Sequence, residues 1–179
     1  MELYVIRHGQ TATNATKGMV GRKQIYALTE KGEEQARNAR SETEKLDYDF
    51  VICSPLLRAK VTCGIVNVKG KEVIEDERIM ERDCGEMEGK PKESFDYPHY
   101  WNYHYDFDFK GMTPIKEFLD TVWGFLDDIK EKYPDKKILI VTHNGVCRAI
   151  GSYFHGIPED GELTVYAHEN CEIKKYIVK

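Results

Sequence analysis

The chain has 179 residues, of which 41% are hydrophobic and 32% are charged, and its formal net charge is −5 at pH 7. This length suits one domain over residues 1–179 with one substantial core, and the composition excludes a disordered chain. No apolar run reaches the roughly 20 residues that a membrane-spanning helix needs, and the acidic balance argues against a nucleic-acid partner. We expect a soluble protein whose partner is a small molecule.

The N-terminus and the cysteines indicate the compartment. Met1 and Glu2 lead directly into an apolar run, without the basic and apolar regions of a secretory signal. The five cysteines form an odd set without a Cys-x-x-Cys pair, which argues against a disulfide framework and a zinc site. We therefore expect a cytoplasmic protein. The sequence leaves the oligomeric state open, with a homodimer as one option.

In the first half of the chain, predicted strands alternate with predicted helices. The apolar run from Leu3 to Ile6 is typical of a buried strand, and so is the run from Phe50 to Cys53. A helix follows Thr29, a suitable N-cap, because small and apolar residues recur behind it at spacings of three and four. Pro55 suits the first turn of a second helix. The predicted inner face of that helix consists of Leu56, Ala59, Cys63 and Val66.

The second half continues the alternation. Ile115 to Tyr133 carry an apolar stripe over about five helical turns, Ile138 to Thr142 are typical of a third buried strand, and a helix follows from about Val146 to Phe154. Two late runs, Leu163 to Ala167 and Glu172 to Val178, are predicted strands, one of them an antiparallel edge. This order predicts an α/β fold, a three-layer sandwich with a mostly parallel central sheet and helices on both faces.

Residues 95–109, FDYPHYWNYHYDFDF, interrupt this pattern. Eight of these fifteen residues are aromatic, yet neither the period of a helix nor that of a strand organises them. We interpret residues 90–112 as a small irregular cap insertion. It either packs on the rest of the domain as a lid or takes part in substrate recognition.

Charged and titratable residues follow each of the three buried strands. Arg7 and His8 follow the first, Arg58 stands shortly after the second, and His143 follows the third. In open α/β sheets ligands bind outside the carboxyl ends of the strands, so these side chains are expected to converge. Two arginines and two histidines repel one another unless an anion binds between them, and nearby helix N-termini add backbone donors. A phosphate is the expected guest, because the planar fork of arginine grips two phosphate oxygens.

Two histidines indicate chemistry beyond binding. A neutral imidazole can attack phosphorus, which splits one difficult displacement into two easier ones, while the second histidine donates to the phosphoryl oxygens. The leaving alkoxide then needs a proton from a nearby carboxylic acid. The charged segment after residue 77 offers Glu81, Asp83, Glu86 and Glu88. The residues by themselves do not distinguish among these four.

Five motifs in order resemble those of a known family and span nearly the whole chain. They are Arg7-His8-Gly9-Gln10-Thr11 with Asn14, Leu28-Thr29-Glu30-Lys31-Gly32, Ser54-Pro55-Leu56-Leu57-Arg58-Ala59 with Thr62, Glu81 with Gly85 and Glu88-Gly89, and Val141-Thr142-His143-Asn144-Gly145 with Arg148-Ala149. This set strongly resembles the histidine phosphatase superfamily, in its phosphoglycerate-mutase-like branch. A single short motif would be weak support, but five in the same order are specific.

The resemblance implies a role for each matching residue. His8 would be the phosphorylated nucleophile, Arg7, Arg58 and His143 the phosphate pocket, and Glu81 the proton donor. Asn14 matches a position that contacts the phosphoryl group or the loop of the nucleophile. The other predicted substrate-binding residues are Gln10, Thr11, Gly21, Arg22 and Asn144. No metal and no other cofactor is implied, because the arginines supply the positive charge.

The chain also departs from the family pattern. Gly111-Met112-Thr113 stands where Gly-Glu-Ser is common, Asn144 stands where glycine is common, and residues 21–27 are one residue longer than usual. We expect the first departure to remove a polar contact to the substrate or the pocket wall and the lengthened segment to change contacts to the substrate. Asparagine at position 144 tolerates left-handed backbone, so we expect that loop to keep its shape. The cations Arg22, Lys23, Lys90 and Lys92 either recognise a second anionic group or are ordinary surface charges.

The remaining choice concerns the acceptor of the phosphoryl group. In the family that this chain resembles, the mutases are larger chains. They carry an extended insertion before the second histidine, which closes the pocket against water. Here only residues 82–142 separate Glu81 from His143, and the long helix takes about twenty of them at 1.5 Å per residue. We therefore predict a phosphatase for a small phosphorylated metabolite, with the aromatic insertion as a partial cap that favours a flat or apolar leaving group. The alternatives are a mutase-type transfer, a module that binds a phosphorylated ligand without catalysis, and a phosphatase for phosphoproteins.

Overall fold

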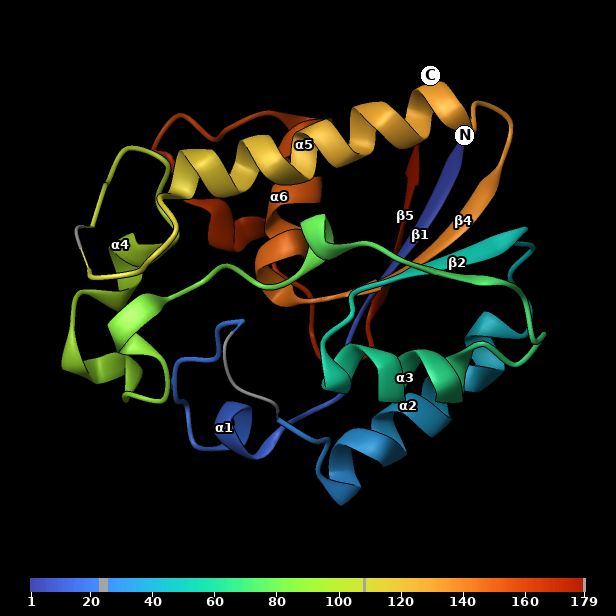
Figure 1. Ribbon diagram of the computed structural model, residues 1–179, viewed down its shortest axis with the longest axis horizontal. Coiled ribbons are helices and arrows are strands. Elements are labelled where there is room, and N and C mark those ends of the chain that lie inside the picture. The colour runs from blue at the N-terminus through green and yellow to red at the C-terminus, as the bar shows by residue number, and fades with distance from the viewer. Residues whose placement is uncertain (23–25, 108, 179) are drawn as a thin grey trace.

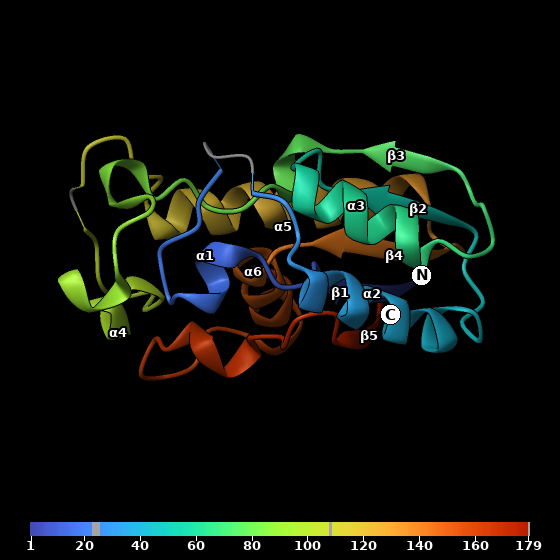
Figure 2. The ribbon, with the colours of Figure 1, turned by 90° about the horizontal axis from the view of Figure 1, so that it is seen from below.

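A computed structural model of the chain describes residues 1–22, 26–107 and 109–178 (Figure 1). These residues form one sheet in the order β3-β2-β4-β1-β5. Its strands are β1 (Glu2–Arg7), β2 (Phe50–Cys53), β3 (Val73–Glu75), β4 (Lys137–Thr142) and β5 (Ile173–Ile177). All neighbours pair in parallel except β5, which is antiparallel to β1. Figure 2 shows β3 and β5 at opposite edges of the sheet.

Helices cover both faces of this sheet. The longer ones are α2 (Glu30–Thr43), α3 (Leu57–Val66), α5 (Ile115–Lys132) and α6 (Asn144–His155). Leu3 and Val5 of β1 belong to the core cluster with α5 and α6, whereas Tyr4 and Ile6 belong to the cluster with α2 and α3. Figure 1 accordingly shows α5 above the sheet and α2 with α3 below it. Alternate side chains of a strand point to opposite faces, so a fully apolar run serves two cores at once. The predicted α/β fold is confirmed.

The starts of α2, α3 and α6 agree with the sequence signals to within two residues. Thr29 caps α2 as predicted, because its hydroxyl accepts a hydrogen bond of 3.0 Å from the Gly32 amide. The predicted place of Pro55 inside α3 is wrong: Leu56 has extended backbone and acts as the N-cap, so Pro55 precedes the helix. The helix expected from Val146 begins two residues earlier, at Asn144, with His143 as its N-cap.

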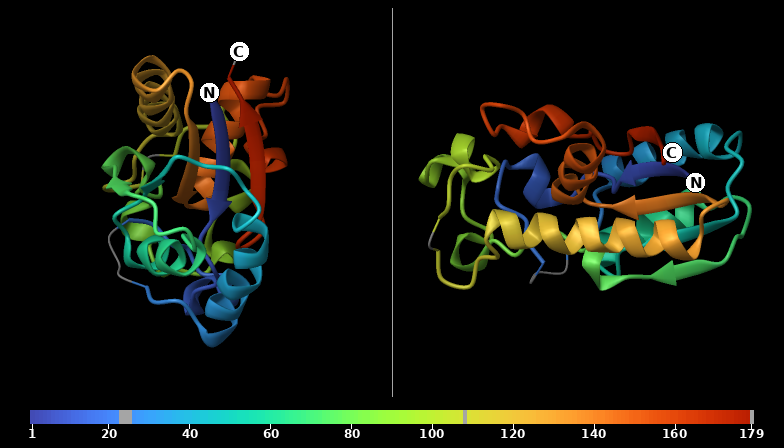
Figure 3. Two further views of the ribbon diagram at one scale, coloured as in Figure 1. Left: turned by 90° about the vertical axis from the view of Figure 1, so that its right-hand side faces the viewer. Right: turned by 90° about the horizontal axis from the view of Figure 1, so that it is seen from above.

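Two strand predictions near the edges need correction. Residues 163–167 form no strand; the 3₁₀ helix η4 (Leu163–Tyr166) occupies them, and Glu162 accepts a hydrogen bond from the Thr164 amide at its start. The edge of β1 that this segment would need is taken by β5, which is the predicted antiparallel edge strand. The strand β3 was not predicted, because it has only three residues, two of them exposed. Figure 3 shows β1 beginning where β5 ends.

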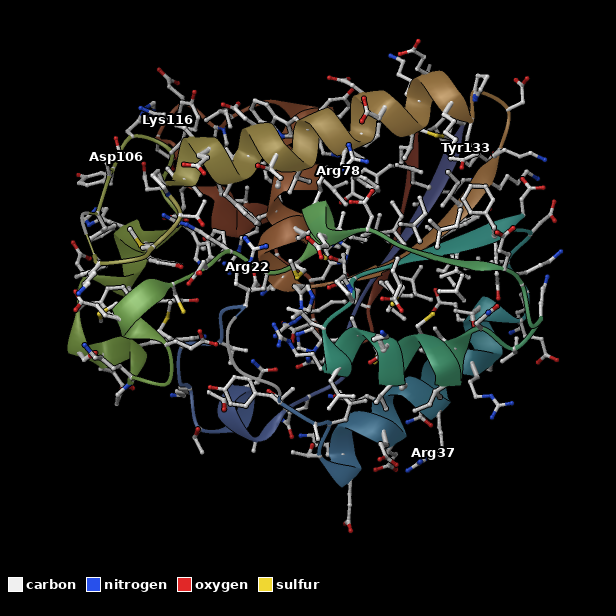
Figure 4. All side chains as sticks on the ribbon, viewed as in Figure 1. Arg22, Arg37, Arg78, Asp106, Lys116 and Tyr133 are labelled. Carbon is white, nitrogen blue, oxygen red and sulfur yellow. The ribbon has the colours of Figure 1, made fainter. Side chains whose placement is uncertain are left out.

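The segment of residues 90–112 is irregular, as predicted, and most of its described aromatic side chains pack into or against the core cluster that α5 and α6 form with the sheet. It contains the 3₁₀ helix η3 (Lys92–Ser94) and the short helix α4 (Tyr97–Tyr100). The ring of Phe95 lies edge-on to the rings of Tyr97, Tyr100, Phe107 and Phe109, with centroids 5.6 to 6.3 Å apart. Such contacts explain why the aromatic residues follow no regular period. An ion pair between Asp106 and Lys116 links the segment to α5 (Figure 4).

Short elements complete the chain. They are α1 (Ala12–Ala15) and the 3₁₀ helices η1 (Glu77–Ile79) and η2 (Gly85–Met87). In Figure 1, β1 and β4 run toward the side of the molecule that carries α1 and α4. Within the described residues, no helix combines the length and apolar character needed to cross a membrane.

Candidate active site

His8 stands directly after β1 and is only 3% exposed. Its Nδ1 lies 2.7 Å from the carbonyl oxygen of Gly9, and its Nε2 lies 3.3 Å from Nε of Arg58. A carbonyl oxygen can only accept and a guanidinium can only donate. The two contacts therefore assign the proton of the neutral ring to Nδ1 and leave the lone pair on Nε2. This is the tautomer in which Nε2 can act as a nucleophile.

The surroundings of His8 also keep its ring neutral. Burial lowers the pKa of His8 well below its ordinary value, and the positive charges of Arg58 and Arg7 lower it further. A protonated imidazole has no free lone pair. The same arginines that would hold an anion thus keep the histidine beside it unprotonated.

His143 stands directly after β4, and its ring lies next to that of His8. The centroids of the two rings are 5.1 Å apart. Ser54 stands 2.7 Å from Nε2 of His143, and its hydroxyl oxygen also accepts from the Leu56 amide, so its proton is free to point at Nε2. The neutral ring then carries its own proton on Nδ1, which is buried and has no partner among the described residues. Burial, followed by the charge of Arg58, lowers the pKa of His143 well below its ordinary value.

Arg7 and Arg58 approach the histidines from two elements, β1 and α3. Arg58 is 1% exposed, and besides His8 it contacts the carbonyl oxygen of Gly21 at 3.0 Å. Arg7 donates from Nη1 to the carbonyl oxygen of His168 at 2.7 Å, and its Nε is buried without a partner in the described structure. Burial lowers the pKa of both guanidinium groups, yet arginine stays charged at neutral pH. Neither group has a carboxylate partner in the described ion pairs, so an anion would find both available.

Glu81 is the one carboxylate among the described residues that line the cavity in front of His8. Its Oε1 accepts from the Arg82 amide at 2.9 Å, and its Oε2 accepts from the Gly145 amide at 3.2 Å. The second contact ties Glu81 to the first turn of α6. A Cβ atom at position 145 would lie 2.1 Å from Oε1 of Glu81, so a side chain there would displace the carboxylate.

The other three candidate acids lie elsewhere. Asp83 accepts a hydrogen bond from the Gly85 amide, and Glu86 is exposed and accepts one from the Lys110 amide. Glu88 is half-buried and, like the other two, is not among the residues that line the cavity. The structure therefore selects Glu81 from the four by position.

The cavity has a volume of about 50 Å³, which is room for roughly three to five water molecules. A phosphoryl group fits such a space. Of the predicted site residues, five line it: Arg7, His8, Asn14, Glu81 and Asn144. Arg58 and His143 are not among the lining residues, but both lie beside the ring of His8: Nε of Arg58 is 3.3 Å from Nε2, and the centroid of the His143 ring is 5.1 Å from that of His8.

Four predicted substrate-binding residues lie outside the cavity wall. The side chain of Gln10 accepts a hydrogen bond from Thr29 and that of Thr11 accepts one from the Asn14 amide, so both are engaged in helix caps. Gly21 acts through its carbonyl oxygen, which holds Arg58. Arg22 lines a separate hollow with Glu77 and Asp83 (Figure 4). Positions 23–25 of the lengthened segment, which include Lys23, lie outside the described residues.

Sequence reasoning missed several residues that line the cavity. The guanidinium of Arg148 lies 4.4 Å from the ring centroid of Trp101, and that of Arg82 lies 4.4 Å from the ring of Tyr100. A signal for Arg148 was present, because residues four apart share a face of a helix and Asn144 had been predicted. No signal marked Trp101 or Tyr100 among the aromatic residues of their segment. Lys92, one of the undecided cations, lines the cavity as well.

No group of three or more histidine, cysteine or carboxylate side chains in the described parts of the chain has the geometry to hold a metal ion. The positive charges that face the cavity come from arginine and lysine, and Glu81 is the one carboxylate among the described lining residues. What the arrangement can do by itself is therefore bind a phosphoryl group, attack it with His8 and exchange a proton through Glu81.

Comparisons with known proteins agree with a site for a phosphoryl group. The family model of the histidine phosphatase superfamily (branch 1) matches residues 3–178. The uncharacterized phosphatase PhoE of Bacillus subtilis (strain 168) is 33% identical over 185 residues, covering 96% of this chain and 92% of that protein. A 2,3-bisphosphoglycerate-dependent phosphoglycerate mutase of Brucella melitensis biotype 2 (strain ATCC 23457) is 27% identical, covering 87% of this chain and 82% of that protein.

Among solved structures, a phosphoserine phosphatase mutant from Entamoeba histolytica in complex with phosphoserine superimposes with a TM-score of 0.83. The two chains are 26% identical, and the match covers 99% of this chain and 91% of the other. Relatives of this chain thus include both phosphatases and mutases.

Proposed function

Because the chain belongs to the histidine phosphatase superfamily (branch 1), we propose that it is a phosphatase that hydrolyses a small phosphomonoester through a phosphohistidine on His8. The observation that carries the proposal is the tautomer of His8. Its Nδ1 is engaged by the Gly9 carbonyl, so Nε2 carries the free lone pair, beside Arg58, on a residue that lines a cavity with several cations. A site that only binds phosphate does not need this arrangement.

The first step transfers the phosphoryl group to the enzyme. Nε2 of His8 forms a bond to phosphorus, the ester P–O bond breaks, and the carboxyl group of Glu81 gives its proton to the departing oxygen. Arg7, Arg58 and Nδ1–H of His143 stabilise the negative charge on the phosphoryl oxygens.

The second step releases phosphate. Water gives its proton to the Glu81 carboxylate and forms a bond to phosphorus, and the P–N bond to His8 breaks. Atoms and charges balance, since His8 and Glu81 both return to their starting states.

Further cations in the cavity favour a leaving group that carries a second anion, such as a carboxylate. Arg148 is 6% exposed, and its Nε has no hydrogen-bond partner within the described residues. Lys92 lies 4.7 Å from the ring centroid of Tyr97 on the same cavity wall. Phosphoserine and phosphoethanolamine differ by one carboxylate, so a higher kcat/KM for phosphoserine that collapses in Arg148→Met tests this preference.

The proposed reaction is tested with a panel of phosphoserine, 3-phosphoglycerate and an aryl phosphate, followed for free phosphate and for isomerised product. We expect phosphate release by the wild type and none by His8→Asn. A phosphoryl adduct that is labile to acid and stable to base should appear on His8 after rapid quenching. Fast isomerisation of 3-phosphoglycerate without phosphate release would show a mutase. Tight phosphate binding without turnover of any ester would show a binding module.

A further inference from the structure

The turn between η4 and β5, residues 168–171, lies against the end of β1. The pairing of β1 with β5 ends at Ile6 and Ile173, and the chain before Ile173 continues past that pair alongside Arg7 and His8. We call these four residues the return turn. Sequence reasoning gave it no role.

The return turn contacts Arg7 and His8, two predicted active-site residues, at both of their backbone carbonyls and at the Arg7 side chain. The side-chain amide of Asn170 donates to the carbonyl oxygen of His8 at 2.8 Å. The backbone amide of Cys171 donates to the carbonyl oxygen of Arg7 at 2.9 Å. The carbonyl oxygen of His168 in turn accepts from the Arg7 guanidinium at 2.7 Å. Three hydrogen bonds from one turn therefore hold two consecutive residues of the site.

The turn is itself held in shape. Asn144 accepts from the His168 amide at 2.9 Å, and Glu172 accepts from the Glu169 amide at 2.7 Å. Cys171 has a φ of +61°, in the left-handed region that non-glycine residues seldom adopt. Such strain persists only where surrounding contacts impose it, and it is concentrated at functional sites.

The Asn170 contact matters because of the peptide group it holds. The peptide between His8 and Gly9 is fixed at both ends: Asn170 binds the His8 oxygen, and Thr62 accepts from the Gly9 amide at 3.1 Å. The next carbonyl, that of Gly9, accepts the proton of Nδ1 of His8. If the His8–Gly9 peptide rotated, this carbonyl would move and Nδ1 would lose its acceptor.

We propose that Asn170 is a positioning residue for His8, which fixes the His8–Gly9 peptide and thereby keeps the proton of the ring on Nδ1. The inference rests on the proposed function, because it assumes that Nε2 is the nucleophile. The proposal has one distinctive consequence: the contact of Asn170 sets the ratio of the two neutral tautomers of His8. Loss of the Asn170 contact lets the proton populate Nε2, which removes nucleophile without removing the phosphate pocket.

The test uses Asn170→Ala and Asn170→Asp in the full chain. The aspartate keeps the shape of asparagine but cannot donate to a carbonyl oxygen when ionised. The matched control is Asn67→Ala, because Asn67 also donates to a backbone carbonyl at 2.8 Å, that of Lys71, in a turn that precedes a strand and does not line the cavity. For each variant, kcat and KM are measured well below the melting temperature, and ¹⁵N spectra of histidine-labelled protein report which nitrogen of His8 is protonated.

We expect kcat to fall by about tenfold to a hundredfold in both Asn170 variants, with KM changed by less than about threefold, since misplacement of a reacting group acts on the chemical step. The His8 spectrum should change from one tautomer to a mixture. An unchanged spectrum in both Asn170 variants, or an equal fall of kcat in Asn67→Ala, would overturn the proposal. The spectrum decides the matter even if no ester is turned over, so failure of the proposed function is distinguishable from failure of this inference.

Discussion

The Nε atom of Arg58 lies 3.3 Å from Nε2 of His8, and the two side chains are 1% and 3% exposed. A permanent cation thus points at the lone pair of the predicted nucleophile. The contact orients the ring and keeps it neutral, because a protonated His8 would be repelled. In the proposed reaction, an incoming phosphoryl group would compete for the same guanidinium, and once one of its oxygens took the Arg58 donor, Nε2 would be free to attack.

This relationship makes Arg58 sensitive to a conservative change. In Arg58→Lys the charge is kept, but a compact ammonium cannot contact His8 and Gly21 in the same way. We expect kcat/KM to fall by about a hundredfold, the size of effect seen when one oriented donor to a developing charge is lost. Steady-state kinetics at fixed pH provide the measurement.

The matched control for Arg58 is Arg37→Lys. Arg37 is an exposed residue of α2 that pairs with Glu33, so its replacement should leave kcat/KM unchanged. Retention of more than about half of the wild-type kcat/KM in Arg58→Lys would contradict the assigned role, because one oriented donor normally contributes far more.

Glu81→Gln should separate substrates by their leaving groups. Without the acid, alkyl phosphates should be hydrolysed about 10²- to 10⁴-fold more slowly, whereas an aryl phosphate with an acidic leaving group needs no proton and should lose much less. Phosphate release from the two ester classes measures the difference. An equal loss on both would argue that Glu81 is not the proton donor.

The same substitution should also cost stability. Both oxygens of Glu81 accept from backbone amides, so the NH₂ group of a glutamine would face a donor. We expect a loss of about 1 to 3 kcal/mol in the free energy of unfolding. Glu86→Gln, at an exposed carboxylate that does not line the cavity, is the control and should change neither the rates nor the stability.

Stability should fall as the pH falls below about 6.5. Burial is the largest cause that lowers the pKa of His8, His143 and His168, the last to about 4, so the unfolded chain binds protons that the folded chain does not. Each such histidine lowers the free energy of unfolding by about 1.4 kcal/mol per pH unit below 6.5, until the pH reaches its folded pKa. Urea unfolding from pH 7.5 to 5 measures the slope.

One substitution and one added ligand identify the groups that make the free energy of unfolding depend on pH. His168→Gln should reduce it by about one proton, because one of the three buried histidines is removed. Saturating phosphate should flatten it, because an anion beside His8 and His143 raises their pKa values toward the ordinary range. If neither change alters the slope, groups other than these histidines cause the pH dependence of stability.

Gly145 and Gly124 should respond oppositely to alanine. At Gly145 a Cβ atom would lie 2.1 Å from Glu81 and 2.5 Å from Trp101, so Gly145→Ala should displace the predicted acid and reduce kcat by at least about tenfold. At Gly124, inside α5, an added Cβ would meet no atom within 4 Å apart from its chain neighbours and the adjacent backbone of its own helix, so Gly124→Ala should stabilise the protein by about 0.5 to 1 kcal/mol. Thermal melts and steady-state rates check both. Full activity in Gly145→Ala would show that the Glu81 contact is dispensable.

Much of the fold was predictable because its signals are local. The buried strands β1, β2 and β4 are continuous apolar runs, and α5 carries a long apolar stripe with the period of a helix. The elements that were missed or misassigned, β3 and η4, are short, and their states depend on which sheet edge is free. Local preference is weak in segments of three or four residues, so packing decides their state.

The sequence by itself determined which chemistry this chain can carry: basic and imidazole groups at three strand ends, placed by a sheet that its apolar runs specify. Only the tertiary structure decided that Glu81 among four acids reaches the cavity, that the proton of His8 lies on Nδ1, and that Asn170 holds the peptide behind it. The physical reason is range. Apolar periodicity acts over a few neighbours, whereas a hydrogen bond between residues far apart along the chain exists only after the sheet, its helices and its edge turn have packed together.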